Sequence, residues 1–286
     1  MTLHATHLRL AYGARSVVEV SDLHLEQGGI TCLVGPNGCG KSTLLKALGG
    51  RLKPAAGRVC LDGKPLPTWA PKALARRLAS LPQSPLAPDG ISVRQLVSHG
   101  RYPHQGLFAG ADADDLEIIE WAMAATHIDH LQHRSFDTLS GGERQRAWLA
   151  MTLVQQAAIL LLDEPTTYLD MGHQAELLEL LAGLQRRHGL TIVMVLHDLN
   201  QASQYADRLL AMRDGQIVAD GPPRHVVDSR LTETLFGLRT ERIWRDFGSR
   251  QIPYCLPLPS GTLGAQTPGT VLLPTAGHTT PSPISA

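Results

Sequence analysis

One nine-residue run limits the possible folds of this chain more than any other feature. The run, GPNGCGKST, spans Gly35–Thr43 and fits the phosphate-loop pattern G-x-x-x-x-G-K-[ST]. In such a loop, backbone N–H groups cradle phosphate oxygens and the lysine neutralises their charge. The apolar run Ile30–Val34 before it predicts a buried strand, and Lys41–Leu48 after it predicts a helix that stops at Gly49. Alone, the run indicates a nucleotide triphosphatase without saying which kind.

The order of apolar segments predicts an α/β fold. Ile159–Asp163 and Thr191–Leu196 are continuous apolar runs, like the one before the phosphate loop, and they lack alternation. This pattern is typical of strands buried on both faces of a parallel sheet covered by helices. Each run leads into a polar loop, which is where doubly wound sheets hold their ligands.

The remaining segments add an antiparallel part and a helical insertion. Asp62-Gly63 predicts a turn in an antiparallel region near the N-terminus. Leu116–Ala125 and Arg144–Gln155 predict helices. We therefore place a helical subdomain at about Pro85–Gln156, inserted between the halves of the nucleotide-binding sheet.

The composition changes near the C-terminus. Residues 251–286 contain no lysine, arginine, aspartate or glutamate and are rich in Pro, Gly, Thr and Ser. Such a segment lacks the contiguous apolar surface that would offset its ordering entropy. We expect residues 1–250 to form one domain and residues 251–286 to form a disordered tail, above all from Leu258 to Ala286.

Overall composition excludes several classes of function. Lysine plus arginine equals aspartate plus glutamate at 26 each, so no net field draws the chain to nucleic acid or anionic lipid. The apolar runs are much shorter than the ~18–20 residues that span a bilayer. The N-terminus lacks the pattern of a secretory signal. The cysteines form no metal-like spacing and predict reduced thiols in a cytosolic protein.

Two further sequence runs indicate which kind of nucleotide triphosphatase the chain resembles. They are LSGGERQR at Leu139–Arg146 and ILLLDEP at Ile159–Pro165. With the phosphate loop, and in this order, the chain resembles the nucleotide-binding subunit of an ATP-binding cassette (ABC) transporter over about Leu3–Leu238. The resemblance implies a P-loop NTPase cassette with a mixed central sheet, an antiparallel β subdomain and an inserted helical subdomain. It also implies ATP as substrate and Mg²⁺ as cofactor.

The resemblance assigns a role to each part of the phosphate loop. Lys41 is expected to contact the β- and γ-phosphates, Ser42 to bind Mg²⁺ and Thr43 to reach the α-phosphate. The glycines let the backbone approach the anion, and the helix N-terminus adds a favourable dipole. Cys39 is expected to be a small filler, with a redox role as the alternative. The loop residues expected to bind ATP are Gly35, Pro36, Asn37, Gly38, Cys39, Gly40, Lys41, Ser42 and Thr43.

Four residues are candidates for catalysis and metal binding beside Lys41. Asp163 ends a buried strand, where a carboxylate is costly unless a cation pairs with it, and Mg²⁺ would be that cation. Glu164 is the candidate to polarise the attacking water. By resemblance, His197 is the switch histidine and Gln83 senses both water and Mg²⁺, which makes Gln83 a metal candidate with Ser42. The alternatives are solvated acids after a strand and a structural histidine.

A second anion site is expected outside the phosphate loop. Ser140, Gly141 and Gly142 head a helix that we expect to start near Arg144, and a helix N-terminus with a hydroxyl attracts anions. By resemblance these residues bind the γ-phosphate of ATP held by a second copy of the chain, in a head-to-tail homodimer. Asp170 would lie across that interface. Tyr168 departs from the Ser-Ala-Leu-Asp that the family more often has.

Tyr12 and three histidines give weaker evidence for binding sites. Tyr12 resembles the aromatic residue that stacks on adenine, and a packed strand tyrosine is the alternative. His127, His130 and His133 recur every three residues but lie in a polar segment without carboxylates or thiols, so we favour a solvated surface over a metal site.

The leading function is an importer ATPase that lies peripherally on the cytoplasmic face of the inner membrane. A separate membrane permease would form the pore, and a solute-binding protein would act indirectly. A soluble ABC ATPase acting on DNA or ribosomes is the alternative from another class. Too few residues separate Lys41 from Ser140 for the coiled-coil arms of the chromosome-type proteins. Glu164 and His197 argue against a module that binds nucleotide without hydrolysis.

The expected cargo rests on resemblance alone. Asp163–Asp170 and Val195–Ala202 look most like the ATPases of ferric-siderophore importers, while cobalamin and haem importers remain alternatives. Arg101, Tyr102 and His104 lie where such subunits meet the permease, so we expect them to couple the two chains. The alternative is a stabilised loop.

Overall fold

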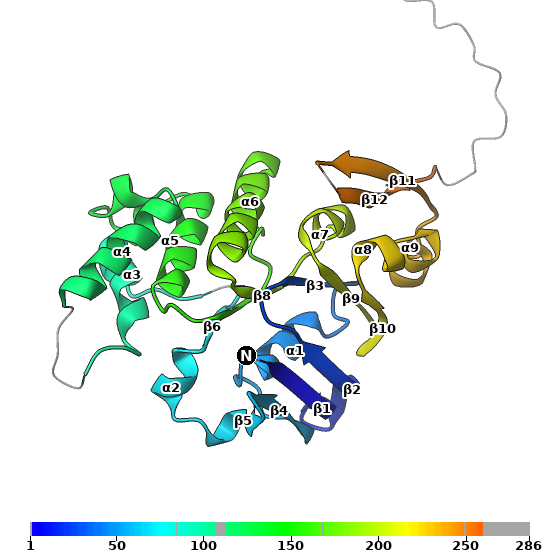
Figure 1. Ribbon diagram of the computed structural model, residues 1–286, viewed down its shortest axis with the longest axis horizontal. Helices are drawn as coiled ribbons and strands as arrows, with labels where there is room; N and C mark the ends of the chain where they lie inside the picture. The colour runs from blue at the N-terminus through cyan, green and yellow to red at the C-terminus, as the bar shows by residue number, and fades with distance from the viewer. Residues whose placement is uncertain (1, 84, 107–111, 168, 249, 260–286) are drawn as a thin grey trace, which may run out of the picture.

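A six-stranded mixed sheet forms the centre of the protein. The computed structural model describes residues 2–83, 85–106, 112–167, 169–248 and 250–259. The strand order is β10-β9-β3-β8-β7-β6, and neighbours are parallel except for β9 and β10. Figure 1 shows this sheet in the middle of the molecule, between α1 (Lys41–Leu48) and α6 (Met171–His188). The strands are β3 (Ile30–Val34), β6 (Leu78–Leu81), β7 (Ile159–Leu162), β8 (Thr191–Val195), β9 (Arg208–Arg213) and β10 (Gln216–Gly221).

The central strands are buried on both faces, as their unbroken apolar runs predict. In β8, Ile192 and Met194 belong to the core under the helices, while Val193 and Val195 belong to the core on the other face. Successive side chains of a strand point to opposite faces, so a strand between two cores needs apolar residues at every position.

A four-stranded antiparallel sheet covers the other side of the phosphate-loop helix. Its order is β2-β1-β4-β5, and its buried face shares a core with α1. Asp62 and Gly63 have φ of 50° and 75°, so the predicted turn between β4 and β5 is confirmed. The elements are β1 (Leu3–Tyr12), β2 (Arg15–Leu25), α1 (Lys41–Leu48), β4 (Ala56–Leu61), β5 (Lys64–Pro65) and α2 (Pro71–Ala75).

A helical subdomain is inserted between β6 and β7. Its helices are α3 (Val93–Ser98), α4 (Ala113–Ala125) and α5 (Gly141–Leu153). α4 begins earlier than Leu116 because the Asp112 carboxylate caps it, accepting from the Asp115 N–H at 2.8 Å. The 3₁₀ turns of this subdomain are η2 (His99–Arg101), η3 (Asp129–Leu131) and η4 (Phe136–Thr138), while η1 (Leu66–Thr68) lies between β5 and α2. The remaining helices are α6 (Met171–His188), α7 (Leu199–Tyr205), α8 (Pro223–Val226) and α9 (Ser229–Phe236).

The expectation that Arg101 contacts another chain is wrong. Its side chain is buried, and Nε donates to Asp115 Oδ1 at 2.6 Å while Nη1 donates to the Val154 carbonyl at 2.8 Å. His104 Nε2 lies 2.8 Å from the Gln155 carbonyl oxygen. Arg101 therefore stabilises the loop, whereas Tyr102 is exposed and stays a candidate contact.

The disordered tail was predicted to start at residue 251, which is too early in the chain. Strands β11 (Thr240–Phe247) and β12 (Arg250–Pro257) pair antiparallel, so residues 251–257 are ordered. The Asn200 side chain on α7 accepts from the Cys255 N–H at 2.8 Å and donates to the Cys255 carbonyl at 3.2 Å. Ile252 and Cys255 are buried. The middle of β12 lacks charge because it packs against α7, whereas Gln251, Leu256 and Pro257 at its ends are exposed. Residues 260–286 lie outside the described residues.

We predict that two truncations differ sharply. A chain ending at Leu258 should keep its ATPase rate and Tm, because the removed segment has no charge and no cassette motif. A chain ending at Gly248 should lose at least about 3 °C, because burial of one aliphatic side chain contributes about 1.5–3 kcal/mol. Calorimetry of both chains beside the full-length protein tests this. Equal Tm values for the two truncations would show that β12 adds no stability.

Candidate nucleotide site

The phosphate loop joins β3 to α1 and fits tightly against its neighbours. Gly35 and Gly40 have φ of 148° and 103°, a region that side chains disfavour. A Cβ on Gly35 would lie 2.1 Å from the Met212 carbonyl oxygen of β9. A Cβ on Gly40 would lie 2.5 Å from Val18 Cγ2 of β2. The loop backbone therefore keeps its shape only with glycine at both positions.

The loop holds a buried cation. Lys41 is 5% exposed, and its Nζ donates to the carbonyl oxygens of Gly35 and Pro36, both at 2.8 Å. A buried ammonium needs such oxygen partners because desolvation is costly. Phosphate oxygens can accept hydrogen bonds from the Lys41 ammonium as these carbonyl oxygens do, and they also carry negative charge.

Cys39 lies inside the same loop. Its side chain is buried, and desolvation raises the pKa of the thiol despite the nearby Lys41 ammonium. A raised pKa disfavours the reactive thiolate. The environment thus suits the expected small filler better than a redox role.

Ser42 and Asp163 form a pair suited to a hard cation. The Ser42 hydroxyl, in the first turn of α1, donates to Asp163 Oδ1 at 2.7 Å. Burial raises the pKa of the Asp163 carboxyl, although the Ser42 hydrogen bond lowers it in part. A divalent cation beside this carboxylate would offset the cost of its burial. Hydroxyl and carboxylate oxygens are the ligands that Mg²⁺ takes, so the pair fits this ion.

Glu164 is the centre of a polar network. Its Oε2 accepts from Gln83 Nε2 at 2.5 Å and from Thr167 Oγ1 at 3.1 Å, and it lies 2.8 Å from His197 Nε2. The network joins the loops that follow β6, β7 and β8. Sequence reasoning missed Thr167; its position three residues after Glu164 was the available signal.

The backbone of Glu164 is strained. Its φ of 52° is left-handed, an uncommon conformation for a residue with a side chain. Such strain costs about 1–3 kcal/mol and persists where the surroundings impose it, often at functional sites. The two neighbouring acids have different partners: the Glu164 carboxylate contacts His197, and the Asp163 carboxylate accepts from Ser42.

One cavity is lined by many of these candidates. Its volume is about 310 Å³, and it opens at the carboxyl ends of the parallel strands. This is the edge of the sheet where ligands bind in doubly wound folds. The lining residues are Asn37, Gly38, Gly40, Lys41, Ser42, Thr43, Gln83, Glu164 and His197.

Several expected binding residues lie outside that lining: Gly35, Pro36, Cys39 and Asp163 in or beside the loop, and Tyr12, Ser140, Gly141, Gly142 and Asp170 on other elements. Tyr12 ends β1 and is 52% exposed. Ser140 caps α5: its Oγ accepts from the Glu143 N–H at 3.3 Å, and its own N–H donates to Glu143 Oε2 at 2.7 Å. This capping box starts α5 at Gly141, ahead of the expected Arg144.

Asp170 has a similar capping position on another helix. It caps α6, where Oδ1 accepts from the His173 N–H at 2.9 Å and Oδ2 lies 2.8 Å from His173 Nδ1. Both helix starts present polar groups at the surface. Tyr168, the expected departure from the family pattern, lies outside the described residues.

These features define a phosphate-loop nucleotide site in an α/β cassette, and comparison with known proteins agrees. The sequence profile of the ABC transporter family matches residues 18–167. Over 237 residues the chain is 51% identical to the ferric enterobactin transport ATP-binding protein FepC of Escherichia coli (strain K12), covering 83% of this chain and 88% of that protein.

Two further comparisons extend the match. The hemin import ATP-binding protein HmuV of Nocardia farcinica (strain IFM 10152) is 48% identical over 223 residues, covering 78% of this chain and 76% of that protein. A solved inward-facing ABC transporter, described as of metal-chelate type, superposes with a TM-score of 0.78 at 28% identity, covering 91% of this chain and 98% of that one. The chain belongs to the ABC transporter family and is one of its ATP-binding subunits, an ATPase.

We predict that Glu164→Gln removes hydrolysis and keeps ATP binding. The substitution retains the shape of the side chain but loses the charge that polarises water, a contribution of ~10²–10⁴-fold in rate. Phosphate release and equilibrium ATP binding, measured on the same preparation, test this. Glu117→Gln, on the exposed face of α4, is the matched control and should behave as wild type. Near-normal turnover in Glu164→Gln would remove the assignment.

Proposed function

We propose that this subunit uses ATP at the described cavity to drive import of a ferric siderophore through a separate membrane permease. The observation that carries the catalytic part is the Glu164 network, which puts an oriented carboxylate beside the phosphate loop. A non-hydrolytic binding module would not need that carboxylate. The cargo rests on similarity to named relatives.

Each residue has a definite task in this proposal. Lys41 neutralises phosphate charge, and the loop N–H groups orient the phosphates. Glu164 accepts a hydrogen bond from the attacking water, while His197 and Gln83 hold the carboxylate in place. Ser42 and Asp163 hold Mg²⁺, which supplies charge neutralisation at the phosphate oxygens.

We further propose that two copies of the chain complete each site. The Ser140 end of α5 carries the N–H groups and dipole that bind anions, yet it is not part of the cavity that contains Lys41. In a dimer, the phosphate loop of one chain and the N-terminus of α5 of the other chain would bind the same phosphate. Asp170 would lie across the same interface, and Tyr12 would stack on adenine.

The dimer predicts complementation between two inactive chains. Purified heterodimers of Ser140→Arg with Lys41→Ala contain one site with both halves intact, so they should hydrolyse ATP faster than either homodimer. The control carries both substitutions in one chain, paired with wild type, which leaves no intact site. Equal rates in the two heterodimers would contradict the head-to-tail arrangement.

A membrane permease is the proposed partner for transport. Among the helices of the described residues, none is both long and apolar enough to cross a bilayer. We propose that the subunit lies on the cytoplasmic face of the inner membrane, contacts the permease through the surface around Tyr102, and serves a solute-binding protein indirectly. We propose no nucleic-acid partner, because the net charge is zero.

Sequence identity to the named relatives favours a siderophore over haem as the cargo only slightly. The relative named for ferric enterobactin is 51% identical over 237 residues, and the one named for hemin is 48% identical over 223 residues. The former is also covered more fully, at 88% against 76% of its length. Haem is therefore the second candidate cargo.

We predict that a strain lacking this subunit, and any redundant ATPase, fails to grow on a ferric siderophore as sole iron source. It should still grow on haemin and take up cobalamin normally. Wild type should restore growth, and Glu164→Gln should not, which ties the defect to hydrolysis. Loss of growth on haemin alone would favour the second cargo and contradict the siderophore assignment.

A further inference from the structure

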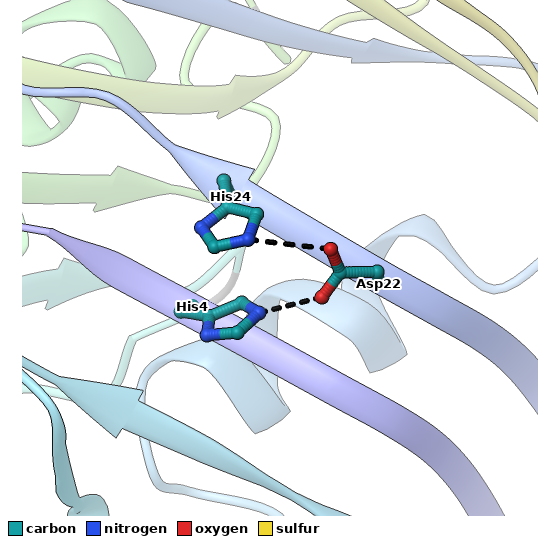
Figure 2. A group of neighbouring side chains, drawn as sticks. All are labelled: His4, Asp22 and His24. Carbon is teal, nitrogen blue, oxygen red and sulfur yellow. Dashed lines mark hydrogen bonds and ion pairs between the residues drawn. The ribbon is translucent and has the colours of Figure 1, made fainter.

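Two histidines and one aspartate meet on the outer face of the four-stranded sheet (Figure 2). In the register of β1 and β2, His4 lies opposite His24 and Thr6 opposite Asp22. Side chains alternate along a strand, so Asp22 and His24 project to one face while Leu23 between them is buried in the core beneath. The hairpin thus places three potential metal ligands side by side, away from the nucleotide cavity.

The ligand atoms lie close together. His4 Nε2 is 2.5 Å from Asp22 Oδ1, and His24 Nε2 is 3.2 Å from Asp22 Oδ2. The two imidazole rings stack with centroids 3.7 Å apart and planes inclined by 13°. Within the described residues, this is the only group of three or more His, Cys, Asp or Glu side chains whose ligand atoms all lie within 4.8 Å of one another.

We propose that His4, Asp22 and His24 bind a divalent first-row transition metal ion, with Zn²⁺ as the reference ion. Two imidazoles and one carboxylate are a donor set that Zn²⁺ and its neighbours take. Bond lengths of about 2.0–2.2 Å put the ligand atoms of a tetrahedral ion about 3.4 Å apart. His24 Nε2 and Asp22 Oδ2 are 3.2 Å apart, which is close to this spacing. His24 and Asp22 are 60% and 56% exposed, which leaves the fourth position to water.

Ligation requires one rearrangement. In the stacked arrangement both Nε2 atoms face the Asp22 carboxylate in nearly parallel directions (Figure 2), so one ion cannot bind both of them until a ring rotates. His24 is exposed enough to rotate, while His4 is 30% exposed and its Nε2 lies 3.3 Å from Thr6 Oγ1. The ion then replaces the protons between the rings and the Asp22 carboxylate; these protons move to Nδ1 or leave to solvent.

The ion would bind only the folded hairpin. His4 and His24 are far apart in sequence and meet through the pairing of β1 with β2. A ligand that binds the folded state alone raises the melting temperature. Metal binding therefore has two readouts, affinity and thermal stability, and neither depends on ATP hydrolysis.

Calorimetric titration of the tag-free full-length chain with Zn²⁺, without nucleotide or Mg²⁺, tests the site. Wild type should bind one equivalent that His24→Ala and Asp22→Asn weaken at least about tenfold, since even partners outside the coordination shell change affinity by this amount. Zn²⁺ should raise the Tm of wild type and leave that of His24→Ala unchanged. His130→Ala, an exposed histidine on η3, is the control and should match wild type.

Unchanged affinity and an unchanged Tm rise in both variants would overturn the proposal, as would the absence of one-equivalent binding by wild type. In either case the cluster is only a hydrogen-bonded histidine stack. Because the substituted side chains are exposed, both variants should fold; circular dichroism and metal-free Tm values verify this. His4→Ala gives an independent second test from the other strand.

Discussion

The close contact between the phosphate loop and its neighbouring strands is the constraint on which the site depends. Gly35 lies directly against the Met212 carbonyl of β9. The Gly215 N–H, in the turn after β9, donates to the Cys39 carbonyl at 3.1 Å, and the Gly215 carbonyl accepts from the Glu19 N–H at 2.8 Å. These contacts join the loop to both sheets. A side chain at Gly35 would therefore disturb the loop backbone and the strand behind it together.

This rigid loop determines where charge is placed. The Lys41 ammonium is held within the curve of the loop, and the Ser42–Asp163 pair lies on the adjoining side, where α1 begins. Glu164, which has a left-handed backbone, contacts Gln83 and His197 instead. The site thus combines a fixed cation, a pair suited to a divalent cation and an oriented carboxylate at one edge of a sheet.

Local patterns predicted much of this arrangement. The phosphate loop, the buried strands and the loops after them follow from unbroken apolar runs that end in polar residues, because a strand between two cores has no solvent face. The C-terminal hairpin was missed, since the absence of charge in residues 251–257 has two physical causes: disorder and burial. Arg101 was misassigned because sequence does not show that Asp115 is buried beside it. The His4–Asp22–His24 cluster depends on strand register, which short-range patterns do not determine.

Equilibrium ATP binding to Lys41→Ala tests the central claim most directly, with Lys46→Ala as the comparison. Both lysines lie on α1, but Lys41 is buried in the loop and Lys46 is exposed. A hydrogen-bonded charge contributes about 1.5–3 kcal/mol, so Lys41→Ala should bind ATP about tenfold to a hundredfold more weakly while Lys46→Ala binds as wild type. Wild-type affinity in Lys41→Ala, or equal losses in both variants, would contradict the account.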